Sequence, residues 1–319
     1  MAENDGKIFN FYLNLPAENR KKIIDKMQTD DRCRFIRCSK LCGTEVKISK
    51  NFIFELEFDI FAIDEMTIKV VYGPRNSRHG FILKFRSYSG NVRICCNLIN
   101  QKLWEDKLEN SADLFRCALK EFKNRLQQSQ NIVRKLSIIE HYLVKSKELL
   151  KNVNFGVENL ENLEELALQA NINFLQFTSK LHHPLKTLFY GGNDINIGNC
   201  PQLYQAQKNV IVWYVQLDKA QFNRLTARNV WIPMGNLTEM NILQFIRSWQ
   251  NGSIGREIGD YRWDVENSNF SMTKLFRLLR VRPTDEDESI EIKHFNKLGT
   301  SAILIDMQED GLQFSAYGT

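Results

Sequence analysis

The pattern of apolar and polar residues has a period of two between residues 52 and 96. Its clearest stretch is residues 52–60, where every second residue is apolar. This period is typical of strands that bury one face. Similar segments follow at residues 67–72, 80–85 and 91–96, and turn signals at Gly73-Pro74 and Ser89-Gly90-Asn91 separate some of them. We therefore predict an antiparallel meander of about four strands over residues 50–100.

The period lengthens to that of a helix after residue 110. Ser111 and Asp113 are suitable capping residues, and Trp104 just before them is expected to cover an edge of the meander. A helix is predicted to run to about Gln128, with the apolar positions Leu114, Phe115, Leu119, Phe122 and Leu126 on one side.

Short apolar runs recur from residue 133 onward. They lie at residues 133–138, 163–168, 185–189, 210–213 and 227–232. Their spacing of roughly 18 to 30 residues is close to the period of leucine-rich repeats, although it is irregular. A helix is expected between the first two runs, over residues 140–151. Because one such unit cannot bury its own apolar face, we predict that the units stack into a short curved solenoid with a parallel sheet.

A well-marked amphipathic helix is predicted within residues 236–252. Thr238 is its cap, Gly252 marks its end, and Ile242, Phe245, Ile246 and Trp249 share one side. After it we expect a strand at residues 261–265, a solvated acidic loop at 284–289, and strands at 301–306 and 312–317. The pair Asp310-Gly311 between the last two is a hairpin signal.

The N-terminal residues 9–49 differ from the rest because they have the pattern of a small helical module. Asn14 and Pro16 are expected to open its first helix, and Ile23, Ile24 and Met27 form an apolar stripe. A second short helix is expected around residues 33–38. About forty residues cannot build a large core alone, so the module must pack on a partner or on the rest of the chain.

Several residues of this module resemble the F-box, the helical motif that docks on the Skp-type adaptor of SCF ubiquitin ligases. They are Leu15-Pro16, Ile23-Ile24, Met27 and Cys38-Ser39-Lys40. A helical hairpin that packs on its own domain would have a similar pattern, so both alternatives stay open at this point.

A second resemblance concerns the C-terminal part. Leu237-Thr238, Asn241, Phe245-Ile246 and Ser248-Trp249, placed after the segment 229–232, are similar to the type 2 F-box-associated domain of nematode proteins. The match covers residues 185–260 best. Together the two resemblances imply a helical F-box-like module at 8–49 and an associated body at 50–319. Within the body, residues 50–100 form the meander and 110–319 the leucine-rich-repeat-like βα region, which gives an α+β or α/β fold class.

The function that these resemblances imply is that of a substrate-recognition subunit. It would bind a Skp-type adaptor and, through it, a cullin ligase, while the body holds an unknown protein target. The implied docking residues are Leu15, Pro16, Ile23, Ile24, Met27, Phe35, Ile36 and Ser39.

Four residues depart from the usual proline and apolar residues of the family, namely Thr29, Asp30, Arg32 and Cys33. A charge buried in an apolar adaptor groove without a partner is costly. The alternative is therefore a protein-binding repeat scaffold, outside any ligase, with a degenerate F-box.

Composition narrows the class of protein further. The 319 residues include 43 basic and 38 acidic residues, and no basic stripe with interleaved aromatic residues stands out, so nucleic acid is not an expected partner. No stretch is apolar enough to predict a membrane span, and the acidic start does not resemble a signal peptide. The seven cysteines are sparse and odd in number, which favours a reducing compartment. We expect an intracellular protein, cytoplasmic or nuclear.

Candidate chemistry is sparse in this sequence. None of the five histidines, His79, His141, His182, His183 and His294, lies in a known nucleophile or metal pattern. The glycines at 191, 192 and 198 lack the order of a phosphate-binding loop. We therefore expect no enzyme activity, metal or cofactor. Trp213, Tyr214 and Trp231 are candidates for aromatic contacts with a partner, with core packing as the alternative.

Overall fold

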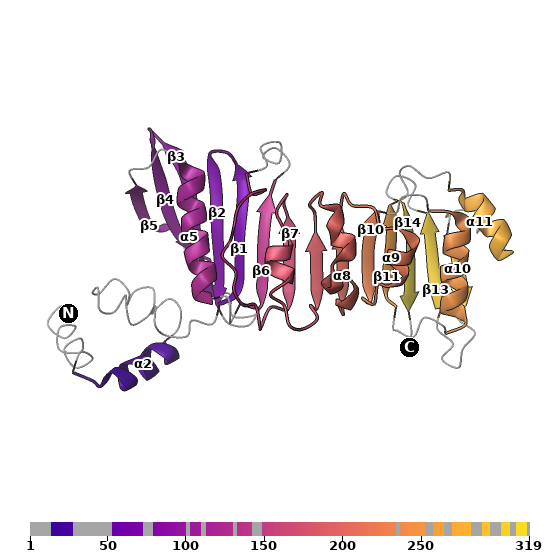
Figure 1. The fold of residues 1–319 in the computed structure, drawn as a ribbon, viewed down its shortest axis with the longest axis horizontal. Coiled ribbons are helices and arrows are strands. Elements are labelled where there is room, and N and C mark those ends of the chain that lie inside the picture. The colour runs from indigo at the N-terminus through magenta and orange to yellow at the C-terminus, as the bar shows by residue number, and fades with distance from the viewer. Residues whose placement is uncertain are drawn as a thin grey trace. The chain divides into compact units, whose positions relative to one another are not determined.

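The computed structural model shows a mixed α/β protein with a large mixed sheet and several helices (Figure 1). The chain divides into two compact units, Met1–Val144 with Phe155–Leu163, and Lys145–Asn154 with Glu164–Thr319. The structure describes residues 14–27, 53–72, 79–99, 103–109, 113–129, 133–141, 149–233, 237–252, 258–264, 270–281, 289–293, 301–306 and 311–317.

The sheet of the first unit begins with an antiparallel meander, as predicted, but with five strands. They are β1 (Ile53–Ala62), β2 (Glu65–Tyr72), β3 (His79–Tyr88), β4 (Asn91–Leu98) and β5 (Leu103–Glu109). Between β3 and β4, Ser89 and Gly90 both have positive φ, as a two-residue hairpin turn of type I′ requires. Trp104, which was predicted to cover an edge of the meander, belongs to the extra strand β5 at that edge.

On the other side of β1 lies β6 (Lys135–Glu140), which runs parallel to it. Helix α5 (Leu114–Ser129) connects the meander to β6 and confirms the predicted helix. Asp113 caps it, since its carboxylate accepts a hydrogen bond of 2.9 Å from the backbone N–H of Arg116. Phe122 of α5 stacks on Phe58 of β1 with ring centroids 5.0 Å apart, which fixes the helix on the apolar face of the sheet.

The second unit contains five parallel strands in chain order. They are β7 (Glu165–Gln169), β8 (Thr187–Tyr190), β9 (Asn209–Val212), β10 (Asn229–Pro233) and β11 (Asp260–Asp264). Glu165 pairs with Thr187, Thr187 with Asn209, and Asn209 with Asn229, so the first four strands repeat after 22, 22 and 20 residues. The apolar runs predicted after residue 160 are thus all strands of one parallel stack.

Three antiparallel strands complete the sheet of the second unit. β14 (Leu312–Tyr317) pairs with β11, and β13 (Ser301–Asp306) and β12 (Ser289–Lys293) follow. The two predicted closing strands are confirmed. β12 was not predicted, because its first residue, Ser289, was assigned to the expected acidic loop. Residues 284–288 of this loop lie outside the described residues.

The connections between these strands are short helical segments. They are α7 (Leu175–Thr178), the 3-10 helix η1 (Ile195–Asn199), α8 (Pro201–Gln205), α9 (Lys219–Asn223), α10 (Glu239–Gln250) and α11 (Met272–Leu279). The predicted α10 is confirmed, with a reciprocal capping box between Thr238 and Asn241 and a positive φ at Gly252. The prediction of a helix over residues 140–151 was wrong for those of its residues that the structure describes. Glu140 ends β6, and residues 149–152 form turns.

An aromatic cluster holds α10 against the sheet. The ring of Phe245 lies 5.2 Å from Tyr261 and 5.2 Å from Trp263, both on β11. It also lies 5.3 Å from Phe314 of β14 and 5.8 Å from Phe222 of α9. One side chain therefore joins two helices to two strands.

The N-terminal helix α2 (Ala17–Lys26) has Pro16, and not the predicted Asn14, at its cap position. Pro16 is the residue before its first turn and makes no side-chain capping bond, so the expected cap by Asn14 is not formed. The carbonyl of Leu15 instead accepts a hydrogen bond of 2.6 Å from Arg20. Glu18 lies in the first turn, where its charge favours the helix dipole.

A buried carboxylate on α10 makes the stability of the second unit depend on pH. The Glu239 side chain is only 4% exposed and accepts hydrogen bonds from the Ser271 backbone N–H at 3.0 Å and from Lys274 at 3.1 Å. Burial alone would raise its pKa, but the hydrogen bonds of its own backbone N–H, Lys274 and Ser271 outweigh burial and lower the pKa.

A lowered pKa means that the folded protein binds this proton less readily than the unfolded chain does. The stabilisation is therefore complete above the usual carboxyl pKa of 4.5 and is lost as the pH falls through the folded value. We expect the free energy of unfolding of Glu239→Gln to fall less than that of the wild type when the pH is lowered from 6 to below the carboxyl pKa. Urea titration at several pH values measures this difference. A Glu239→Gln profile parallel to that of the wild type would contradict this assignment.

Candidate functional site

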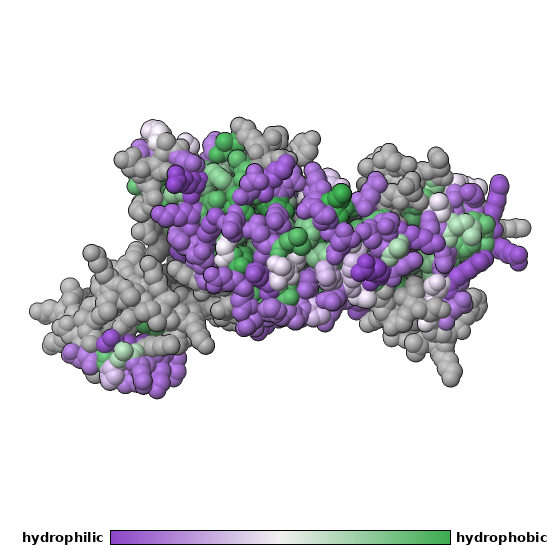
Figure 2. Space-filling view, viewed as in Figure 1, coloured by the Kyte–Doolittle hydropathy of each residue, from purple (hydrophilic) through white to green (hydrophobic). Residues whose placement is uncertain are grey.

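The parallel strands of the second unit have two different faces. Leu188, Val210 and Val230 are buried, whereas their neighbours Phe189, Ile211 and Trp231 are only half-buried. The helices pack on the buried side, since Phe222 of α9 and Phe245 of α10 contact Tyr261 there. Hydrophilic side chains dominate the outer surface of this helix-covered side in Figure 2. We call the opposite side of β7–β11 and β14 the open face.

The strand register brings one residue from each strand into a row across the open face. The row consists of Ala167, Phe189, Ile211, Trp231, Arg262 and Gln313. Neighbouring strands lie about 4.8 Å apart, so adjacent members of the row are within contact distance. Residues that are 20 to 51 positions apart in sequence thus form a single surface.

Aromatic rings make this surface continuous. Trp213 follows β9 and lies 4.6 Å from Phe189 and 5.9 Å from Trp231, both in edge-to-face contact. Tyr214 extends the series at 6.4 Å from Trp213; it is 61% exposed and has a positive φ of 61°. The three aromatic residues proposed from the sequence as contact residues are therefore neighbours and accessible, and none is fully buried.

Trp231 is held in place by two neighbours on β11. Its indole N–H donates a hydrogen bond of 3.0 Å to the carboxylate of Asp264. The guanidinium of Arg262 lies over its ring at 4.7 Å from the centroid, which is a cation–π contact. The indole and the guanidinium are thus fixed relative to each other before any partner binds.

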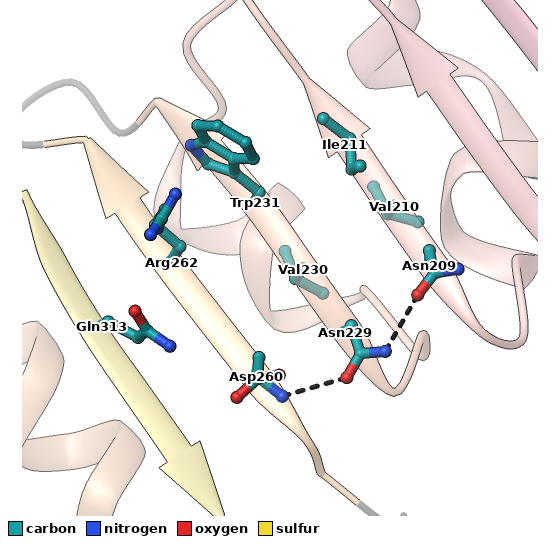
Figure 3. A pocket seen from close by; sticks show the side chains of 9 residues that line it. All are labelled: Asn209, Val210, Ile211, Asn229, Val230, Trp231, Asp260, Arg262 and Gln313. Carbon is teal, nitrogen blue, oxygen red and sulfur yellow. Dashed lines mark hydrogen bonds between the residues drawn. The ribbon is translucent and has the colours of Figure 1, made fainter. Parts of the chain in front are cut away.

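A ladder of side-chain amides borders the row at the start of the strands. Asn229 donates to Asn209 at 2.9 Å, and Asn209 donates to the hydroxyl of Thr187 at 3.0 Å. The backbone N–H of Asp260 donates to Asn229 at 3.0 Å, so the ladder crosses four strands. Figure 3 shows its links among Asn209, Asn229 and Asp260. A Cβ at Gly259 would lie 2.3 Å from the Asn229 oxygen, which explains why a glycine precedes Asp260.

Between the row and the ladder lies a groove of about 270 Å³. Figure 3 shows that Arg262 and Asp260 project from β11 at two levels of this groove, with Trp231 beside Arg262. Its lining residues are Asn209, Val210, Ile211, Asn229, Val230, Trp231, Asp260, Arg262 and Gln313. The groove therefore combines an apolar floor with one cationic and one anionic side chain.

Comparisons with known proteins add no assignment to this geometry. No protein-family model matches the chain, and no curated protein and no solved structure is similar to it. Function is therefore inferred from the residues of the chain itself.

The docking residues suggested by the F-box resemblance lie on or beside α2 where they are described. Pro16 is exposed, Leu15 and Met27 are half-buried, Ile23 is 38% exposed, and Ile24 is fully buried. Phe35, Ile36 and Ser39 lie outside the described residues, as do Thr29, Asp30, Arg32 and Cys33. Ile23 is accordingly a large apolar residue of α2 that a partner can reach.

The first unit carries its own charged cluster on the side of β1 that faces away from α5. Glu55 lies 3.0 Å from Lys69 and 3.1 Å from Lys135. Burial opposes the ionisation of Glu55, but the hydrogen bonds and charges of the two lysines lower its pKa. Burial raises the pKa of Asp59, which lies 3.0 Å from His141.

Within the described ranges, no three His, Cys, Asp or Glu side chains are grouped so that they could hold a metal ion. No helix there is long and apolar enough to cross a membrane.

Proposed function

We propose that the chain is a protein-recognition subunit of the F-box type, which holds a target protein on the open face of its second unit. The observation that carries this proposal is that Phe189, Trp231 and Arg262 of the row lie together, with Trp213 in contact with both aromatic rings. Tryptophan and arginine are enriched among the few well-packed residues that dominate the binding energy of protein interfaces. Here both types lie together on a half-exposed sheet surface.

The repeat of 22, 22 and 20 residues supports leucine-rich-repeat-like units in this part of the chain. Stacks of such units use the surface formed by neighbouring repeats to bind other proteins. The open face has the expected construction, because one strand of each unit contributes one side chain to the row.

The N-terminal module would supply the link to the ubiquitin machinery. We propose that Leu15, Pro16, Ile23, Ile24 and Met27, together with Phe35, Ile36 and Ser39, contact a Skp-type adaptor and so bring a cullin ligase. The chain itself would catalyse nothing. It would act by proximity, since tethering raises the effective concentration of a target lysine near the ubiquitin-loaded enzyme.

A protein-binding scaffold outside any ligase is the second candidate. The observation in its favour is that Ile24 is fully buried within the chain, so this residue of the apolar stripe already has an internal role. The polar residues Thr29, Asp30 and Arg32 also fit this candidate, because they do not suit an apolar adaptor groove.

Co-purification with the Skp-type adaptor of the host separates the two candidates. We expect the wild type to retain the adaptor and the double variant Leu15→Ala, Pro16→Ala to lose it. Because Pro16 makes no capping bond, α2 should persist in this variant. Lys22→Ala, at an exposed site on the same helix, is the matched control and should bind like the wild type. If the wild type is folded by circular dichroism and retains no adaptor, the scaffold candidate is correct.

A further inference from the structure

The groove on the open face has a defined charge pattern, and this pattern indicates what kind of target segment fits. We propose that it receives an extended segment of the target protein in which an acidic and a basic side chain are two residues apart. The acidic side chain meets Arg262, and the basic side chain meets Asp260. This inference rests on the proposed role of the open face in target binding and adds the chemistry of the target.

Arg262 is suited to hold a carboxylate. Its guanidinium is stacked on Trp231, and Asp264 fixes Trp231 in turn through the indole N–H. A side chain that is ordered before binding loses less conformational entropy when its partner arrives. The planar guanidinium can also form two parallel hydrogen bonds with a carboxylate, which a single point charge cannot do.

Asp260 supplies the complementary charge at the other level of the groove. It is exposed, and its backbone N–H is tied to the amide ladder through Asn229. Its carboxylate is therefore held at a fixed height on the sheet. A lysine or arginine of the target is the natural partner for an exposed carboxylate beside an apolar floor.

The spacing of the two charges selects an extended segment. Asp260 and Arg262 are two residues apart on β11 and both line the groove. Their Cα atoms are therefore separated by about 6.5 Å along the strand direction. In an extended target segment alternate side chains point the same way with the same separation, so residues i and i+2 can meet both groups together.

The volume of the groove and the contact made by the nearby Asp264 are consistent with an extended target segment. A volume of about 270 Å³ holds a few side chains, and it is too small for a folded element. Asp264 is the next carboxylate on β11, but it accepts the hydrogen bond of Trp231. The apolar side chain of Ile211 and the ring of Trp231 lie beside the position of the acidic residue, where they limit its access to water.

A library of short random peptides displayed on phage and selected on the full-length chain tests the proposal. We expect the wild type to enrich peptides with an acidic and a basic residue two positions apart. The order of the two residues reports the direction of the bound segment. The exchange variant Asp260→Lys, Arg262→Glu should enrich the opposite order.

Single variants then measure each contact with the best peptide. Arg262→Gln should weaken binding roughly tenfold or more, as is usual for a central arginine in an interface. Arg262→Lys should restore only part of the affinity, because it keeps the charge and loses the planar group. Arg224→Gln is the matched control, since Arg224 also stacks on a ring, that of Tyr204, but does not line the groove. It should leave affinity unchanged.

Three outcomes overturn the proposal: no enrichment by the folded wild type, enrichment without the charge pair, or an unchanged preference after the exchange. Circular dichroism of the exchange variant establishes that it is folded. Adaptor co-purification with the same variants is independent of the groove. If the peptide tests fail while adaptor binding persists, the groove chemistry alone is wrong. If the wild type does not bind the adaptor, the ligase function is wrong.

Discussion

Replacing Phe245 with alanine lowers the free energy of unfolding by about 3 to 5 kcal/mol, the range for large-to-small changes at buried aromatic residues. Phe245 is 7% exposed and contacts the rings of Phe222, Tyr261, Trp263 and Phe314. Its removal leaves a cavity that four rigid rings cannot fill by small shifts. Urea titration followed by near-ultraviolet circular dichroism measures the loss.

The control for this variant is Leu175→Ala on α7. Leu175 is 49% exposed, so its truncation removes little buried surface and should change stability by no more than about 0.5 kcal/mol. Equal urea midpoints for the two variants would show that Phe245 does not hold α10 to the sheet as described.

The second large effect is expected at Gly311, directly before β14. Its φ is +109°, and a Cβ at this position would lie 2.0 Å from the carbonyl oxygen of Trp263 and 2.9 Å from the Cα of Asp264. Both contacts are with the backbone of β11, which cannot rotate away as a side chain can. We expect Gly311→Ala to lower the free energy of unfolding by roughly 2 kcal/mol or more, since it combines backbone strain with overpacking.

Gly90→Ala separates the two contributions to this effect. Gly90 also has a positive φ, +78°, but a Cβ there would have no atom within 4 Å. The strain of the left-handed conformation alone costs about 1 to 2 kcal/mol. A Gly311→Ala variant that is no less stable than Gly90→Ala would rule out the close approach of β14 to β11.

Much of the sheet could be predicted from the sequence. Strands β8, β9 and β10 each have two buried apolar residues at alternate positions and follow turn residues, and this local pattern survives in the fold. The helix α10 was predictable for a similar reason, because its capping box and its apolar side are both local features.

The elements that were not predicted lack the clear apolar periodicity on which prediction from local sequence depends. β5 has the sequence LWEDKLE, in which charged residues outnumber apolar ones, as is common in a strand at a sheet edge. β12 is short and follows an acidic stretch. The helix expected at residues 140–151 was inferred from apolar spacing alone. Its expected first residue, Glu140, is the last residue of strand β6.

The candidate site was only partly visible in the sequence. Trp213, Tyr214 and Trp231 were noted as possible contact residues because of their type. Arg262 could not be connected with them, since it follows Trp231 by 31 residues and only the pairing of β10 with β11 brings the two together. The recurrence of Asn209 and Asn229 at strand starts, 20 residues apart, was a signal that could have revealed the amide ladder.

The two-faced construction of the strands separates folding from recognition. On β8, β9 and β10 the residues Leu188, Val210 and Val230 fill the core, while the next residue of each strand belongs to the open face. A substitution in the row therefore changes what the surface can hold and leaves the packing beneath it almost intact. Under the proposed function, each strand offers one position at which the target preference can change without a change in the scaffold.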